Sequence, residues 1–204
     1  MSGVVRVTTT DSFAADFVIP AVATLHREQP GIEVQLQTST QMLNLAKREA
    51  DIAVRTHQPE NPDLIVRRLA RWGTGLFASA RYVEARGIPE AGSAFAGHDL
   101  VVYQPYLDAG KDVFLAGEPI IHGRIAMTCT SGFMVRRALA AGLGVGELPL
   151  PLGEADGLLR LWPDRPPLPY DVWLVTHKDV RHTARVRAVI DAIVQAFDVA
   201  TASA

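Results

Sequence analysis

Three short stretches of the sequence gather side chains that can hydrogen-bond to a small polar ligand. They are residues 8–12, 38–41 and 128–132, and each follows a strand-like run and precedes a helix-like one. Hydroxyl groups donate to a carboxylate or accept from an amine. A helix start adds free backbone N–H groups and the positive end of the helix dipole. The pattern favours a small, polar, most naturally anionic ligand, although each hydroxyl could instead cap only its own helix.

Two charged residues lie close to these stretches in the expected fold. Arg55 ends a short apolar strand, where its guanidinium could pair with a ligand carboxylate or form an outward ion pair. Glu147 interrupts the apolar run at residues 145–150, so it is either an edge residue or a carboxylate turned into a cleft. We include Thr10, Thr130 and Glu147 among the expected ligand contacts.

The sequence lacks the motifs of the common catalytic and metal sites. It has no Gly-x-Ser-x-Gly, no His-Glu-x-x-His and no Cys-x-x-Cys, and its six histidines are scattered. The run from Gly142 to Gly146 lies after a helix and before a strand, which is the reverse of a dinucleotide-binding turn. It is better interpreted as a helix C-cap followed by close packing. We therefore expect no catalytic residues, no metal and no cofactor.

Composition narrows the class of protein further. The 204 residues are 48% hydrophobic and 21% charged, with a net charge of −2, which is ordinary for a globular domain. No concentrated basic patch would let this chain bind DNA by itself. No run reaches the ~18 apolar residues of a membrane helix. The single cysteine, Cys129, suits a reducing cytosol, so we expect a cytoplasmic protein that contacts no membrane.

Strand and helix patterns alternate along the whole chain, which predicts an α/β fold with a largely parallel sheet and helices on both faces. Expected strands are residues 4–8, 32–37, 51–55, 64–69, 74–78, 100–103, 120–127, 145–148 and 172–176. Expected helices are residues 17–28, with Asp11 and Ser12 as possible caps, 41–49, 133–141 and a C-terminal helix with an apolar stripe from Val186 to Phe197.

The two βα-rich halves predict two similar lobes. Residues 1–80 and 172–204 would form lobe I, and residues 81–171 would form lobe II. Two crossovers, near residues 78–81 and 171–173, would act as hinges beside an inter-lobe cleft. Such clefts are where small ligands usually bind.

Several segments, in this order, resemble the substrate-binding domain of LysR-type transcriptional regulators. The more specific are ADIAVR (residues 50–55) and AGLGVGELP (residues 141–149), and the likeness runs from about Val4 to Phe197. The resemblance implies a type-2 periplasmic-binding-protein fold with two Rossmann-like lobes. It also implies effector contacts at Ser12, Phe13, Thr38, Ser39, Arg55, Thr56, Tyr103, Gln104, Ser131, Gly132 and Phe133.

The same resemblance implies partners and a mechanism. A small-molecule effector, often a carboxylate in this family, would change how homodimers or homotetramers pack through residues 17–28 and 32–37. DNA would be contacted only by an N-terminal winged helix-turn-helix, which residues 1–204 do not include. A solute-binding protein of a transport system is the alternative, because fold does not fix function. An enzyme on this fold would need an acid–base pair, for which Glu147 with a histidine is the sole suggestion.

Overall fold

The computed structural model describes residues 1–39, 50–110, 112–179 and 181–202. They form two compact units. Unit 1 comprises Met1–Arg71 and Asp171–Ala204, and unit 2 comprises Trp72–Tyr170. The chain passes from one unit to the other within two strands, β4 (Leu64–Ala78) and β11 (Leu168–His177). The sequence placed these boundaries after residues 80 and 171, and the assignment of lobes I and II stays a prediction.

Unit 1 is built on a mixed sheet with the strand order β4–β11–β3–β1–β2. Its other strands are β1 (Gly3–Thr9), β2 (Ile32–Thr38) and β3 (Ile52–Arg55). β1 runs parallel to both β2 and β3, whereas β11 is antiparallel to β3. Within unit 1, the expectation of a largely parallel sheet is therefore correct for the three strands nearest the N-terminus but not for β11. Those three strands end at the same edge of the sheet, and this places residues 8–10 beside residues 38–39.

The first helical segment starts earlier than the sequence suggested, at Asp11 and not at residue 17. It consists of α1 (Asp11–Phe13), the π-helical turn η1 (Ala14–Val18) and α2 (Ile19–Glu28). Thr10 is the N-cap residue, so Asp11 and Ser12 are not caps but the first helical residues. The π turn is explained by Pro20, which lacks an N–H and would clash with a carbonyl one turn earlier. Ile19 donates to the Ala14 carbonyl, and this wider turn accommodates the ring.

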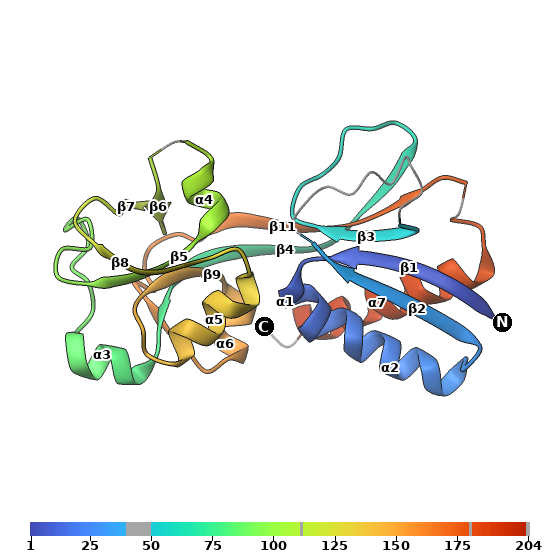
Figure 1. Ribbon diagram of the computed structural model, residues 1–204, viewed down its shortest axis with the longest axis horizontal. Coiled ribbons are helices and arrows are strands. Elements are labelled where there is room, and N and C mark those ends of the chain that lie inside the picture. The colour runs from blue at the N-terminus through green and yellow to red at the C-terminus, as the bar shows by residue number, and fades with distance from the viewer. Residues whose placement is uncertain (40–49, 111, 180, 203–204) are drawn as a thin grey trace. The chain divides into compact units, whose positions relative to one another are not determined.

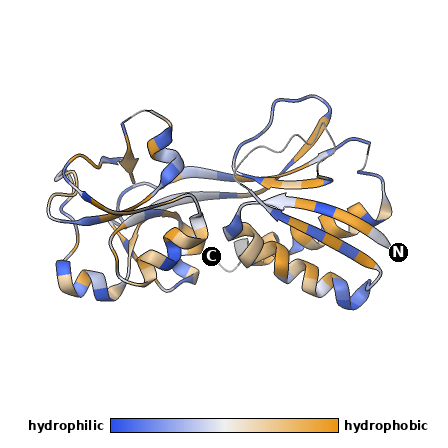
Figure 2. Cartoon of the chain, viewed as in Figure 1, coloured by the Kyte–Doolittle hydropathy of each residue, from blue (hydrophilic) through white to orange (hydrophobic). Residues whose placement is uncertain are grey.

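The C-terminal helix α7 (Ala184–Ala202) packs against α2 on one side of this sheet (Figure 1). The predicted apolar stripe is confirmed, since Val186, Val189, Ile193 and Phe197 are buried. Hydrophobic residues dominate β3 and alternate with polar ones along β2, as Figure 2 shows. β3 is buried along its whole length because it is flanked by strands on both sides.

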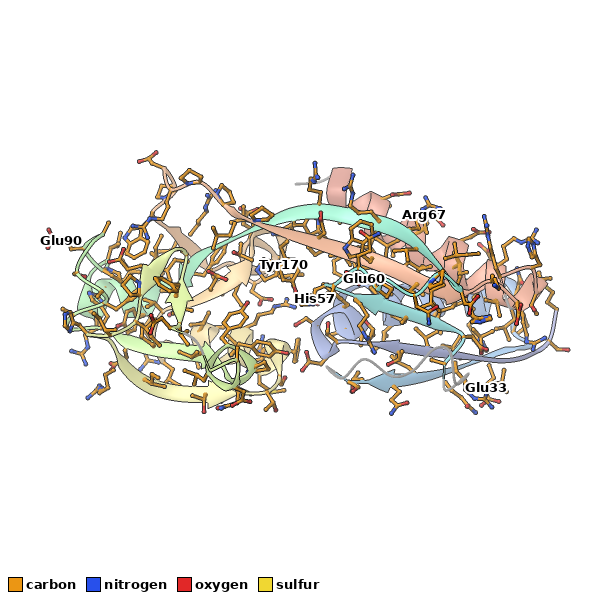
Figure 3. All side chains as sticks on the ribbon, turned by 90° about the horizontal axis from the view of Figure 1, so that it is seen from above. Glu33, His57, Glu60, Arg67, Glu90 and Tyr170 are labelled. Atoms are coloured by element: carbon orange, nitrogen blue, oxygen red, sulfur yellow. The ribbon has the colours of Figure 1, made fainter. Side chains whose placement is uncertain are left out.

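The two outer strands of the unit 1 sheet carry charged side chains instead. Figure 3 shows Glu33 on β2 and Arg67 on β4, at opposite edges of this sheet. Both side chains are exposed. Charges on edge strands discourage unwanted pairing with other chains.

Unit 2 holds two hydrophobic clusters packed around β4 and β5. Its strands, besides the last part of β4, are β5 (Asp99–Tyr103), β6 (Phe114–Leu115), β7 (Glu118–Pro119), β8 (Arg124–Cys129), β9 (Gly146–Pro149) and β10 (Leu159–Leu161). Its helices are α3 (Ala80–Arg86), α4 (Gln104–Asp108), α5 (Gly132–Ala140) and α6 (Leu150–Ala155).

Two strand predictions needed correction. The expected strands at residues 64–69 and 74–78 are one strand, β4, since the backbone stays extended through Trp72 and Gly73. The strand expected at residues 120–127 is β8, which starts at Arg124 because Ile120 and Gly123 close a turn. The expected helix at residues 41–49, with Thr40 as a possible cap, lies outside the described residues.

The glycine run from Gly142 to Gly146 behaves as the sequence predicted. Gly142 follows α5 with a φ of +80°, and its N–H donates to the Leu139 carbonyl. A Cβ atom on Gly144 would lie 2.5 Å from the Asp99 carbonyl oxygen. This run is therefore a helix cap followed by close packing of β9 against β5.

Candidate functional site

The carboxyl ends of β1 and β2 meet at one edge of unit 1. Thr9 pairs with Thr38 in the parallel register, and the Ser39 backbone N–H donates to the Thr9 carbonyl at 2.9 Å. The junctions containing Thr10 and Ser39 are therefore neighbours. Thr38 is exposed and Ser39 is half-buried, so both remain accessible to solvent on this edge.

Arg55 lies at the end of β3 beside the same junctions. It is only 8% exposed, so its side chain does not extend outward into solvent. Its Nη2 donates to the Thr8 hydroxyl at 2.7 Å, and its Nη1 donates to the Val54 carbonyl. Burial lowers the pKa of this guanidinium. A desolvated guanidinium attracts a carboxylate more strongly than an exposed one does.

Ser12 and Phe13 differ in what they can offer a ligand. Ser12 is 7% exposed and its backbone N–H is bound by the Asp11 carboxylate at 2.8 Å. Phe13 is fully buried in an aromatic group with Phe17 and Phe197, so its side chain packs in the core of unit 1. The role of both residues in ligand binding stays a prediction.

The remaining unit 1 candidate, Thr56, follows β3 directly. Its hydroxyl hydrogen-bonds to Nδ1 of His57 at 3.1 Å. Thr9, which the sequence did not single out, has a buried hydroxyl without a hydrogen-bond partner within the described residues. Its place inside a threonine triplet at a strand end is the feature that could have identified it.

In unit 2, the parallel pairing of β5 with β8 brings two other predicted segments together. Tyr103 pairs with Cys129, so Gln104 and Thr130 are the next residues along each strand. Ser131 caps α5, because its hydroxyl accepts from the Met134 backbone N–H at 3.0 Å. The helix then starts with Gly132 and Phe133. Capping is thus established for Ser131, and a second role in ligand contact stays a prediction.

Glu147 is half-buried on β9, opposite Leu76 of β4. Its Oε2 accepts a hydrogen bond from the Ala116 backbone N–H at 2.5 Å. Burial raises the pKa of the Glu147 carboxyl, and the Ala116 N–H partly opposes that shift. Burial also raises the pKa of Tyr106, and the nearby Glu147 and Tyr103 raise it further.

The structure therefore adds Tyr106 to the residues that the sequence had grouped. Tyr106 packs edge-to-face on Tyr103 with a ring separation of 5.5 Å. The two tyrosines are three residues apart, where β5 ends and α4 begins.

The raised pKa of Glu147 has a measurable consequence for stability. Relative to the unmodified chain, Glu147→Gln is expected to become progressively more stabilising as the pH rises above about 4.3, the ordinary glutamate value. A group with a raised folded-state pKa contributes stability below its unfolded value, and this is lost as the pH rises through the folded value. Glutamine has no proton to lose. Urea unfolding of both proteins near pH 4 and pH 7 measures the difference, and a difference that stays constant with pH would contradict this reading.

The described residues contain no group of three or more histidine, cysteine or acidic side chains placed to hold a metal ion. Within the same part of the chain, no helix is both long and apolar enough to cross a membrane.

Comparison with known proteins assigns a family to this arrangement. Residues 1–198 match the family described as LysR substrate binding domain. An HTH-type transcriptional regulator of Haemophilus influenzae is 24% identical over 144 residues, covering 67% of this chain and 48% of that protein. CrgA, an HTH-type transcriptional regulator of Neisseria meningitidis serogroup C, is 26% identical over 150 residues, covering 72% of this chain and 49% of that protein. The chain thus spans about half the length of these relatives.

Solved structures support the same fold. The regulatory domain of CrgA from Neisseria meningitidis superposes with a TM-score of 0.81 at 24% identity, covering 96% of this chain and 98% of that chain. The regulatory domain of AphB from Vibrio vulnificus gives a TM-score of 0.75 at 24% identity, covering 95% and 99%. The predicted type-2 periplasmic-binding-protein fold is confirmed. The relatives named here are transcriptional regulators, so neither a transport role nor an enzyme gains support.

Proposed function

Because the chain belongs to the LysR substrate binding domain family, we propose that it senses a small-molecule effector on behalf of a longer transcriptional regulator. Binding of that effector would alter the activity of a DNA-binding domain elsewhere in the full protein. The single observation that best supports a ligand role is the burial of Arg55. Its guanidinium donates a hydrogen bond to the Thr8 hydroxyl at the edge of the sheet where β1, β2 and β3 end.

The chemistry of this edge favours a carboxylate on the effector. The guanidinium of Arg55 supplies positive charge, and hydroxyls of Thr10, Thr38 and Thr56 supply hydrogen bonds on the same unit. An arginine can hold a carboxylate through two parallel N–H···O bonds. A buried arginine also gains more from a counter-ion than an exposed one, since water screens it less. We therefore propose that unit 1 binds an anionic group of the effector.

Unit 2 would contribute contacts from the ends of β5 and β8 and from the start of α5. These contacts are Tyr103, Gln104, Thr130, Ser131, Gly132 and Phe133, with Glu147 on β9. The effector can act only through different affinities for two arrangements of the protein. We propose that these arrangements differ in how two copies of the chain pack through α2 and β2, in a homodimer or homotetramer.

A ligand screen by thermal unfolding tests the effector-sensing proposal. Small carboxylates, amino acids, aromatic acids and sugars are each added to the purified chain. A ligand at 100 times its Kd should stabilise the folded state by about 2.7 kcal/mol. Thr38→Ala is expected to remove most of this gain, because Thr38 is exposed at the end of β2 and its loss leaves the core intact.

Gln37→Ala is the matched control, since Gln37 is the preceding exposed residue of β2 and its side chain points to the other face of the sheet. It should leave the ligand-induced shift unchanged. If no compound raises the melting temperature of the folded chain, the effector-sensing proposal fails for these ligand classes. If a ligand stabilises both variants equally, the unit 1 contacts are wrong.

A further inference from the structure

Among the described residues of unit 2, one half-buried carboxyl group has no arginine partner, whereas three other carboxylates that are buried or half-buried each have one. Asp99 is bound by Arg86 and Arg124, Glu118 by Arg165, and Asp156 by Arg136. Glu147 is half-buried as well, but within the described residues no lysine or arginine forms an ion pair with it. Its charged form is therefore desolvated, with hydrogen bonding but no counter-charge among the described residues to offset the cost.

Two polar groups of the chain lie beside the Glu147 carboxyl. The Ala116 backbone N–H is the donor that binds its Oε2. On β4, Thr74 lies on the same face of the sheet as Leu76, which pairs with Glu147. The Thr74 hydroxyl is buried and lies close enough to the Glu147 carboxyl to lower its pKa, but it makes no hydrogen bond of normal geometry to any described residue. A partner from outside the chain could satisfy both groups.

Two aromatic rings complete this cluster. Although 37% of Tyr106 is exposed, its hydroxyl end is desolvated and lies near Glu147. Burial raises the pKa of this phenol, and the nearby Glu147 carboxylate raises it further. Tyr103 is half-buried and packs edge-to-face on Tyr106. Aromatic faces next to a carboxylate attract an ammonium group through both Coulomb and cation–π interactions. An anion would meet repulsion at the same place.

We propose that Glu147, Thr74, Tyr103 and Tyr106 form a subsite in unit 2 that binds a protonated amino group of a small ligand. The inference rests on the proposed effector-sensing function and makes it more specific, because the effector would then carry an ammonium group. Glu147 accepts from the ammonium, the two rings flank it, and the Thr74 hydroxyl accepts a second N–H. The amine provides the positive charge that arginine provides at the other buried carboxylates.

NMR titration of the isotope-labelled chain with propylammonium chloride tests this subsite. The amide of Ala116 reports on it directly, because that N–H is bound by Glu147. Saturable shifts of the Ala116 and Thr74 amides are expected with propylammonium. 1-Propanol and propionate, which match its size, should produce none. Affinity should also fall when the pH is lowered and Glu147 becomes protonated.

Glu147→Gln is expected to weaken propylammonium binding by about tenfold or more, since a charge-assisted hydrogen bond is lost. Glutamine can still accept from Ala116, so the local fold should persist. Tyr106→Phe, which keeps the ring, provides a second variant and should weaken binding more modestly. Glu90→Gln is the control, because Glu90 is an exposed carboxylate of the same unit (Figure 3).

Three results would overturn the ammonium subsite. They are scattered shifts that do not saturate, equal binding of 1-propanol, and unchanged binding by Glu147→Gln. The thermal-unfolding screen with Thr38→Ala distinguishes failure of the ammonium subsite from failure of the effector-sensing proposal. If a carboxylate still stabilises the chain through Thr38 while the amine fails, the ammonium subsite alone is wrong.

Discussion

Phe197→Ala is expected to lower the free energy of unfolding by about 3–5 kcal/mol. Phe197 is fully buried on α7 and stacks on Phe17, with ring centroids 4.1 Å apart and planes 15° from parallel. Phe13 meets it edge-to-face at 5.9 Å. Truncation removes a whole ring from contact with Phe13 and Phe17 and leaves a cavity in the core of unit 1. Urea unfolding followed by circular dichroism measures the loss.

Val199→Ala on the same helix is the control for Phe197. Val199 is 62% exposed, and removing its methyl groups should change the free energy of unfolding by no more than about 0.5 kcal/mol. A cost below about 1 kcal/mol for Phe197→Ala would mean that the aromatic group of unit 1 rearranges to fill the space. α7 would then contribute less to the stability of unit 1 than its burial indicates.

The burial of Phe197 could be predicted because it depends on local spacing. The stripe from Val186 to Phe197 repeats at the helical period, so one face of α7 had to face the core. The cap at Ser131 and the glycine turn at Gly142 are equally local, and both were predicted from neighbouring residues. The strand-to-helix junctions at residues 8–12 and 128–132 could also be predicted from little more than the alternation of strand and helix patterns.

Features that depend on strand register could not be predicted in this way. The guanidinium of Arg55 donates a hydrogen bond to Thr8, which lies 47 residues earlier in the sequence. This contact exists because β3 pairs with β1, and no residue near Arg55 in the sequence indicates that pairing. The antiparallel return of β11 is likewise invisible in hydrophobic patterns. The sequence left Glu147 as either an edge residue or a cleft carboxylate. The pairing of β9 with β4 shows that it is half-buried and bound to Ala116.

Arg136→Met is the second large effect expected, and it concerns a contact that sequence reasoning missed. The side chain of Arg136 is only 3% exposed, although nothing beside it in the sequence distinguishes it from its exposed neighbour Arg137. Its Nε and Nη2 donate to the two carboxylate oxygens of Asp156 at 2.6 and 2.7 Å. This bidentate pair connects α5 to the end of α6. Removing the arginine leaves Asp156 largely buried without its counter-charge, which costs about 3–5 kcal/mol for such pairs.

Arg137→Met is a closely matched control, because Arg137 is the next residue of α5 and is exposed. The two variants have the same composition and net charge, so any difference between them reports burial and pairing alone. Arg137→Met should change the free energy of unfolding by no more than about 0.5 kcal/mol. The double variant Arg136→Met with Asp156→Leu should recover part of the loss, since an apolar pair can replace a buried ion pair. Equal costs for the two single arginine variants would show that Asp156 finds water or another donor when Arg136 is removed, and that the pair contributes orientation more than stability.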